Sequence, residues 1–296
     1  MRYYFLAVAT CCLLSPVFAA AADQPRLVCA SRRTDNADIF LLNADGTGVK
    51  NLTNHPAYDH YPAPSPDGKK IVFQSQRHGV MNLFVMDADG SNVKQLTSER
   101  TVSQSPCWSP DGKQIAFSRT MADANHEIFI MNADGSNPVN LTNDPAWDSD
   151  PAWSPNGKKI VFTSNRAGGG FRVYTIDVDR GFVQALTTTD NNMGSVFPSW
   201  SPDGKKVVYG DVAGGALELF VCNANGTGHQ QLTKLGGRNS FASWSPDGKQ
   251  IAFQHIEAGG KEGTLYLIDA DGSNPKQVLD MDGKPFADAH AAWLPK

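Results

Sequence analysis

A polar residue stands five positions before each tryptophan, or its equivalent, in a phrase that recurs along the chain. Three of these residues are carboxylates and three are neutral. They are Asp59, Ser103, Asp148, Ser195, Asn239 and Asp288. If the segments converge, they form a polar ring that could hold a cation or the basic groups of a partner. The alternative is a solvated, hydrogen-bonded lining without a specific ligand.

Two histidines lie close to two of these carboxylates. His60 follows Asp59 directly, and His290 lies two residues after Asp288. Two histidines and two carboxylates together could bind a transition metal. Tight ligand spacing such as His-x-x-x-His is absent. The sequence therefore predicts no cofactor, and a divalent cation at this place stays an open alternative.

Basic residues follow the second predicted strand in four of the repeats. They are Arg32-Arg33, Arg77, Arg119 and Arg166. The planar guanidinium group of arginine pairs well with a carboxylate through two hydrogen bonds. These side chains either form a positive arc for an acidic partner or pair with carboxylates of the loops around them. We favour the internal pairing.

Aromatic residues in the variable loops are candidates for partner contact, because aromatic anchors carry much of the binding energy of protein interfaces. They are Tyr58, Tyr61, Trp147, Phe197 and Phe241. Some of them are expected to pack between neighbouring repeats instead. The complete predicted partner-binding set consists of Asp59, His60, Tyr61, Asp148, Asp150, Asp288, His290, Arg77, Arg119, Arg166, Trp147, Phe197 and Phe241.

Catalytic signatures are missing from the chain. There is no Gly-x-Ser-x-Gly nucleophile elbow, no phosphate-binding loop and no dinucleotide fingerprint. Serine, histidine and aspartate are present without the spacing of a known motif, so the sequence predicts a non-enzymatic protein. The alternative is a metal-assisted carbohydrate lyase or hydrolase, of the kind that acts on oligouronides, which would use Asp59, His60, Asp288 and His290.

The elements that must position these residues come from an internal repeat. A Leu-Thr pair closes each unit at Leu52, Leu96, Leu141, Leu186 and Leu232, with Val278-Leu279 in the sixth place. The steps between these positions are 44, 45, 45, 46 and 46 residues. A fixed period of this length with several short strand patterns per unit is typical of a β-propeller blade.

Each unit contains four short strand patterns. The second and third, such as 114–117 and 128–131, alternate β-branched and aromatic residues as half-buried strands do. Asp-Gly or Asn-Gly pairs, such as Asp67-Gly68, supply the positive φ of tight hairpins between strands.

The loops on the opposite face vary between repeats. That loop-rich face, which carries the connections from second to third strand and from one repeat to the next, is where a partner would be selected.

The two ends of the repeat array complement each other. The pattern at 26–30 is a second strand without a first, and 291–295 is a first strand without a second. The last strand is therefore expected to complete the first blade and remove exposed sheet edges. The sequence predicts an all-β fold, a six-bladed β-propeller of four-stranded blades, closed by its C-terminal strand.

Composition and the N-terminal segment indicate where the protein acts. Of the 296 residues 19% are charged, with a net charge of −4 and no basic cluster, which argues against nucleic-acid binding. Residues 1–22 have the basic start, apolar centre and small residues of a secretory signal. Residues 23–296 would then form one domain, exported to the periplasm or secreted, without membrane insertion.

Cys29, Cys107 and Cys222 are expected to be buried thiols rather than a disulfide framework.

The repeat resembles that of a known family. The string Trp-Ser-Pro-Asp-Gly-Lys-x-Ile-Ala-Phe, followed by Ile-Phe-x-Met-x-Ala-Asp-Gly and Leu-Thr, is similar to the propeller repeat of the periplasmic TolB family. The resemblance extends from Arg26 to Trp293 and implies a TolB-like propeller. Members of the family carry an α/β domain before the propeller, and we expect this chain to lack it. The retained part is the one that, in the family, docks the peptidoglycan-associated lipoprotein.

These observations lead to one functional prediction. We expect an exported, non-catalytic monomer that binds a protein or peptide, such as an envelope lipoprotein, over its loop-rich face and the mouth of its central channel.

Overall fold

Short runs of alternating β-branched and aromatic residues form strands throughout the chain, because such side chains fit a pleated, half-buried surface. The computed structural model describes residues 24–34, 36–98, 100–188, 194–287 and 290–295. The predicted signal segment 1–22 lies outside the described residues. Within the described residues, no helix is long and apolar enough to cross a membrane.

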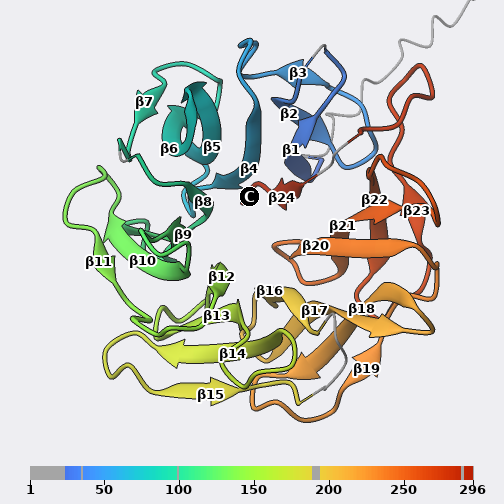
Figure 1. Cartoon of the computed structure of the whole chain (residues 1–296). Coiled ribbons are helices and arrows are strands. Elements are labelled where there is room, and N and C mark those ends of the chain that lie inside the picture. Colours follow the sequence, from blue (N-terminus) through green and yellow to red (C-terminus); the bar gives the residue numbers. More distant parts are fainter. Residues whose placement is uncertain (1–23, 35, 99, 189–193, 288–289, 296) are drawn as a thin grey trace, which may run out of the picture.

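Each repeat supplies four strands, numbered here in chain order (Figure 1). The first strands lie nearest the centre: β4 (Asp59–Pro64), β8 (Ser103–Trp108), β12 (Asp148–Trp153), β16 (Val196–Trp200), β20 (Arg238–Trp244) and β24 (Ala291–Trp293). The second strands are β1 (Arg26–Ser31), β5 (Lys70–His78), β9 (Gln114–Thr120), β13 (Lys159–Ser164), β17 (Lys206–Ala213) and β21 (Gln250–Ile256).

The outer half of each repeat consists of one long and one very short strand. The third strands are β2 (Asp38–Asn43), β6 (Val80–Asp87), β10 (His126–Asn132), β14 (Arg172–Asp177), β18 (Ala216–Asn223) and β22 (Thr264–Asp269). The fourth strands are β3 (Lys50–Asn51), β7 (Lys94–Gln95), β11 (Val139–Asn140), β15 (Val183–Ala185), β19 (Gln230–Gln231) and β23 (Lys276–Gln277).

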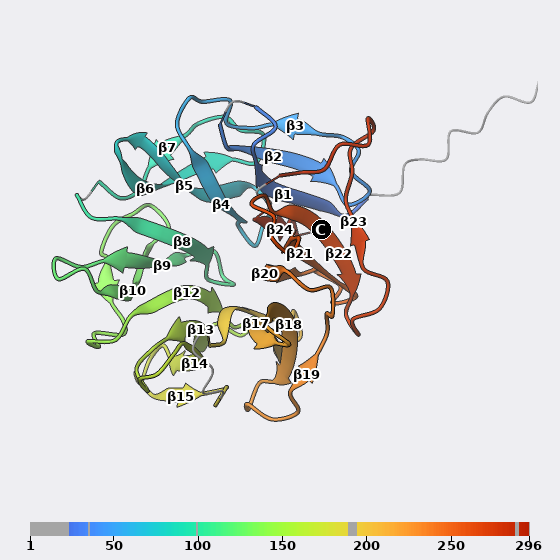
Figure 2. The ribbon, with the colours of Figure 1, turned by 45° about the vertical axis from the view of Figure 1, so that its right-hand side comes forward.

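The strands form blade-like sheets around a common centre (Figures 1 and 2). In the described part of the chain there are four four-stranded sheets and one eight-stranded sheet. The larger sheet arises because one parallel bridge, between Leu217 of β18 and Arg238 of β20, joins two neighbouring four-stranded groups. The predicted all-β fold of four-stranded, blade-like sheets is confirmed.

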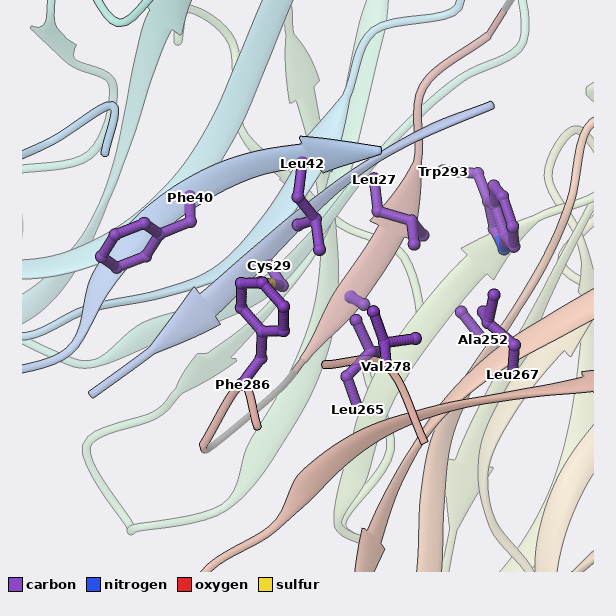
Figure 3. Close-up of a cluster of buried hydrophobic side chains, with 11 residues drawn as sticks. Leu27, Cys29, Phe40, Leu42, Ala252, Leu265, Leu267, Val278, Phe286 and Trp293 are labelled. Carbon is purple, nitrogen blue, oxygen red and sulfur yellow. The ribbon is translucent and has the colours of Figure 1, made fainter. Parts of the chain in front are cut away.

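The C-terminal strand lies beside the N-terminal one. β24 pairs antiparallel with β1, with Leu27 opposite Trp293. A buried cluster links the first and last repeats, and it brings Leu27 and Phe40 together with Leu265 and Trp293 (Figure 3). The Trp293 indole donates a hydrogen bond of 3.0 Å to the Ser243 carbonyl.

The third-to-fourth strand turns also pack against the preceding repeat. Gly90 has a φ of 93°, and a Cβ atom there would lie 2.5 Å from the Leu52 carbonyl oxygen. Gly46 makes the corresponding approach to Leu279, at the far end of the chain. Only glycine fits such contacts, because any side chain would collide with the neighbouring backbone.

The threonine of each Leu-Thr pair fastens the fourth strand to the third. The Thr233 hydroxyl donates to Glu218, and it accepts a hydrogen bond of 2.8 Å from the Leu219 amide. Thr53 makes the same two kinds of bond, to Asp38 and from Ile39. This pairing explains why threonine closes the repeat.

The three cysteines of the described chain are free thiols. Cys29 and Cys222 are buried in the apolar core, as expected for small hydrophobic side chains. Burial raises the pKa of the Cys222 thiol to about 11. These thiols are therefore protonated at neutral pH.

Candidate functional site

A bulge occurs at the same place in five of the inner strands. In β4, for example, His60 pairs with Gln74 but Ala63 pairs with Val72, so β4 contains one extra residue. The extra residue has a left-handed backbone with φ between 50° and 55° in every case. These residues are Tyr61, Ser105, Asp150, Phe197 and Phe241. Each such conformation costs about 1–2 kcal/mol for a residue with a Cβ atom, and bulges commonly re-aim a side chain.

The bulge residues line a central cavity of about 170 Å³. His290 lines it from the segment just before β24. A second cavity of about 250 Å³ shares Tyr61, Ser105, Asp150 and Phe197 with the first and reaches Trp147. The two cavities therefore adjoin near the centre of the molecule, and the second one extends toward the loop-rich face.

One side of the central cavity is aromatic. The Phe241 ring centroid lies 4.1 Å from that of Phe197 and 3.8 Å from that of His290. Tyr61 completes the group, with its centroid 4.1 Å from His290 and 5.5 Å from Phe241. Such rings present both an apolar surface and electron-rich faces.

The lining of the cavity also carries a carboxylate. The Asp150 side chain accepts hydrogen bonds from the Ser105 hydroxyl at 3.1 Å and from the Ser149 hydroxyl at 2.9 Å. Burial raises the pKa of Asp150, although the two hydroxyls act in the opposite direction. The negative charge of Asp150 also contributes, after burial, to a strongly raised pKa at Tyr61. The cavity thus combines aromatic rings with one acidic group.

The five described members of the ring of polar residues predicted five positions before each tryptophan are buried instead of lining this cavity. Asp59 and Asp148 have no exposed surface. Asp59 accepts a hydrogen bond of 2.7 Å from Arg77, and Asp148 accepts one of 2.8 Å from Arg166. Each of these carboxylates therefore pairs with an arginine of its own repeat. This agrees with the favoured prediction that the arginines pair internally.

Two other members of the ring are likewise hydrogen-bonded to side chains within their own repeats. The Ser195 hydroxyl donates 2.9 Å to Asp211, and the Asn239 side-chain oxygen lies 2.7 Å from His255 Nδ1. Ser103 pairs in register with Arg119. Asp288 lies outside the described residues.

The three arginines also lie on the aromatic core of their repeats. The Arg77 guanidinium is 5.3 Å from the Phe73 centroid, and Arg119 is 4.6 Å from that of Phe129. Arg166 lies 5.1 Å from Phe162. Cation–π attraction holds all three side chains in the blade, and ion pairs add to it for Arg77 and Arg166. Their role in this structure is internal.

His60 and His290 come together, with ring centroids 4.1 Å apart. Burial, and to a smaller extent the charge of Arg32, lowers the pKa of His60 to about 3, so this imidazole is neutral. Asp59 does not join them, because Arg77 holds its carboxylate. Among the residues with described positions, no three of His, Cys, Asp or Glu cluster closely enough to hold a metal ion.

The structure thus brings together Tyr61, Asp150, Phe197, Phe241 and His290 of the predicted set. Trp147 stays 37% exposed on the loop-rich face and stacks on His126. Sequence reasoning missed Ser105, the bond partner of Asp150. A signal was available, because Ser105-Pro106 occupies the same repeat position as Asp150-Pro151 and Phe197-Pro198.

Blade-like sheets around a central cavity define a protein of the β-propeller class. The chain belongs to the family described as the TolB beta propeller domain, whose model matches residues 7–122 and 95–296. This membership confirms the TolB-like resemblance of the repeat. A comparison with curated proteins found no match.

Solved structures of two TolB proteins are similar to this one. TolB from Acinetobacter baumannii is 26% identical with a TM-score of 0.80, over 92% of this chain and 67% of that chain. The putative TolB from Agrobacterium tumefaciens is 21% identical with a TM-score of 0.73, over 92% of this chain and all of that one. The oligogalacturonate lyase of Vibrio parahaemolyticus is 14% identical with a TM-score of 0.55, over 87% of this chain and 73% of that one. The last two show likeness of fold alone.

Proposed function

We propose that this TolB-like propeller is a non-catalytic interaction module that binds another protein, or a peptide, over its loop-rich face and central cavity. The observation that carries the proposal is that the two cavities adjoin: they share Tyr61, Asp150 and Phe197, and Trp147 lines the second one. A half-exposed aromatic residue beside a concave surface is a typical interface anchor.

The architecture that we propose is a closed ring of six blades. The pairing of β24 with β1 supports it. The approach of Gly46 to Leu279 supports it further, because the same contact joins consecutive repeats elsewhere, as at Gly90 and Leu52. Closure would hold the bulge residues rigidly around one cavity, which lowers the entropy that is lost when a partner binds.

We further propose that the protein is exported to the periplasm or secreted and acts at the cell envelope as a monomer. Residues 1–22 support export through their signal-like composition. The family resemblance supports an envelope lipoprotein as the kind of partner.

Affinity capture from envelope extracts tests this function. The mature protein should retain a partner, and Trp147→Ala should reduce the recovery because it removes an exposed ring of the loop-rich face. Phe182→Ala is the matched control, since Phe182 is 67% exposed but lies in the β14–β15 turn of the opposite face. Equal loss in both variants, or no loss in Trp147→Ala, would count against this surface.

The alternative function is a metal-assisted carbohydrate lyase or hydrolase that uses Asp59, His60, Asp288 and His290. The contact between the two histidine rings is the observation in its favour. The bond between Asp59 and Arg77 is the observation against it. Turnover of acidic oligosaccharides with added manganese or zinc, lost in His60→Ala, would establish the alternative and overturn the non-catalytic assignment.

A further inference from the structure

Asp150 differs from the other two carboxylates that the first strands place near the centre. Asp59 and Asp148 each pair with an arginine at 2.7–2.8 Å. The Asp150 carboxylate receives only two neutral hydroxyl groups, at 3.1 and 2.9 Å. In the part of the chain that the structure describes, no lysine, arginine or histidine forms an ion pair with it. A carboxylate removed from bulk water without a counter-charge is costly, and a bound cation would compensate it.

The surroundings of Asp150 suit an organic cation better than a metal ion. Calcium requires six to eight oxygen ligands, and magnesium requires an octahedron of them. Asp150 offers one carboxylate, and the cavity that it lines is also lined by Phe197, Phe241 and Tyr61. Aromatic faces attract ammonium and guanidinium groups and also accept the apolar stem to which such a group is attached.

The size of the cavity is sufficient for a small organic cation. A water molecule needs roughly 10–15 Å³ of such a volume. The central cavity of about 170 Å³ therefore admits an unbranched chain of several non-hydrogen atoms. The adjoining cavity extends toward the loop-rich face, because Asp150 and Phe197 line both cavities and Trp147 lines the second.

We infer that the central cavity binds an ammonium or guanidinium group on an unbranched apolar stem. The charged end pairs with Asp150, and the stem lies along Phe197 and Phe241. The inference rests on the proposed function in one respect: the group is assigned to a lysine or arginine side chain that a partner protein inserts from the loop-rich face.

Titration of the mature protein with small probes tests the cation chemistry. n-Pentylammonium should bind and shift the amide resonances of Tyr61, Asp150 and Phe241, whereas the neutral isostere 1-pentanol should bind far more weakly. Asp150→Asn should weaken pentylammonium binding at least about tenfold, because it removes one member of a partly buried charge pair. Equal binding of the alcohol, unchanged binding in Asp150→Asn, or no binding by wild type would overturn the inference.

A matched control is available in a surface turn. Asp203 bonds to the Ser201 hydroxyl, and Asn156 occupies the equivalent turn position with the same bond to Ser154. Asp203→Asn should therefore fold normally and bind pentylammonium like wild type. Phe241→Leu provides a second test that keeps the charge, and it should also weaken binding because it removes an aromatic face. A thermal melt of each variant shows that it is folded.

Two further experiments test separately whether the cation comes from a protein side chain and whether the surface binds a partner. N-acetyl-lysine methylamide should compete with pentylammonium, as a partner's lysine would; failure to compete would overturn the assignment to a protein side chain. In the capture experiment, loss of the partner from Trp147→Ala but not from Asp150→Asn would keep the proposed function and overturn the insertion of a cation. Loss from both variants would support the two proposals together.

Discussion

The buried pair of Asp148 and Arg166 gives the sharpest test of how the repeat is held together. The Asp148 side chain has no exposed surface, and that of Arg166 is 15% exposed. Removing one member of a buried pair typically costs about 3–5 kcal/mol, because a charge is left without compensation. We expect Arg166→Ala to lower the free energy of unfolding by about 3 kcal/mol, the lower end of that range, since the arginine retains some contact with water. Loss of the contact with Phe162 adds to the effect.

Urea denaturation followed by circular dichroism measures this change. The loss of stability should be larger at pH 8 than at pH 5. Burial raises the pKa of Asp148; without Arg166 the carboxyl can take up a proton when the pH is lowered, and the uncompensated charge then disappears. The double variant Asp148→Ala/Arg166→Met should recover much of the loss, because no unpaired charge remains.

Lys205→Ala is the matched surface control. Lys205 lies 3.9 Å from Asp203 with 81% of its side chain exposed, so its removal should change stability by less than about 0.5 kcal/mol. If Arg166→Ala is as mild as this control, or if the double variant is as unstable as the single one, the assignment of a structural role is refuted. A mild effect combined with lost partner capture would place Arg166 in the interface instead.

Three further predictions concern the turns and closures of the repeat. The Ser65 hydroxyl, as the largest cause, lowers the pKa of Asp67, and related bonds act in the equivalent turns. Stability in thermal melts should therefore continue to fall as pH drops below the usual aspartate range, near pH 4. This adds to a loss that begins below the usual histidine range, near pH 6.5, because His60 stays neutral in the folded protein. Gly90→Ala should destabilise the protein by more than Gly79→Ala in chemical denaturation, because both have φ above 90° but only Gly90 meets a neighbouring carbonyl. Thr233→Val should lower stability by about 1–3 kcal/mol in the same assay, because it leaves the buried Glu218 without its hydroxyl donor.

Each of these predictions has an outcome that contradicts it. Stability that stops declining above about pH 4 would show that the turn carboxylates contribute nothing to the acid response. Equal losses in the two glycine variants would mean that the close approach contributes nothing beyond backbone strain. A Thr227→Val variant, which alters an exposed turn hydroxyl, should be nearly neutral, and a comparable loss there would remove the special role of the Leu-Thr closure.

The repeat could be recognised from sequence because its determinants are local. Strand alternation, Asp-Gly turns and Leu-Thr closures each occupy a few neighbouring residues, so the period and the four strands of each unit follow directly from them. The role of the threonine did not follow, because its acidic partner lies 15 residues away, as for Thr233 and Glu218.

The site residues were only partly predictable, and the reason is the bulge. In a regular strand, residues two apart point to the same side, so Asp148 and Asp150, both in the predicted partner-binding set, would face the same way. One extra residue with φ of 53° at Asp150 breaks this alternation. Asp148 consequently lies buried beside Arg166, while Asp150 lines the central cavity.

The sequence by itself determined the all-β repeat, its turns and its TolB-like family, because these depend on short-range patterns. Tertiary structure alone decided which side chains meet at the centre. Tyr61, Asp150 and Phe241 belong to different repeats, and only their convergence around one cavity brings aromatic rings together with a carboxylate that has no ion-pair partner among the described residues.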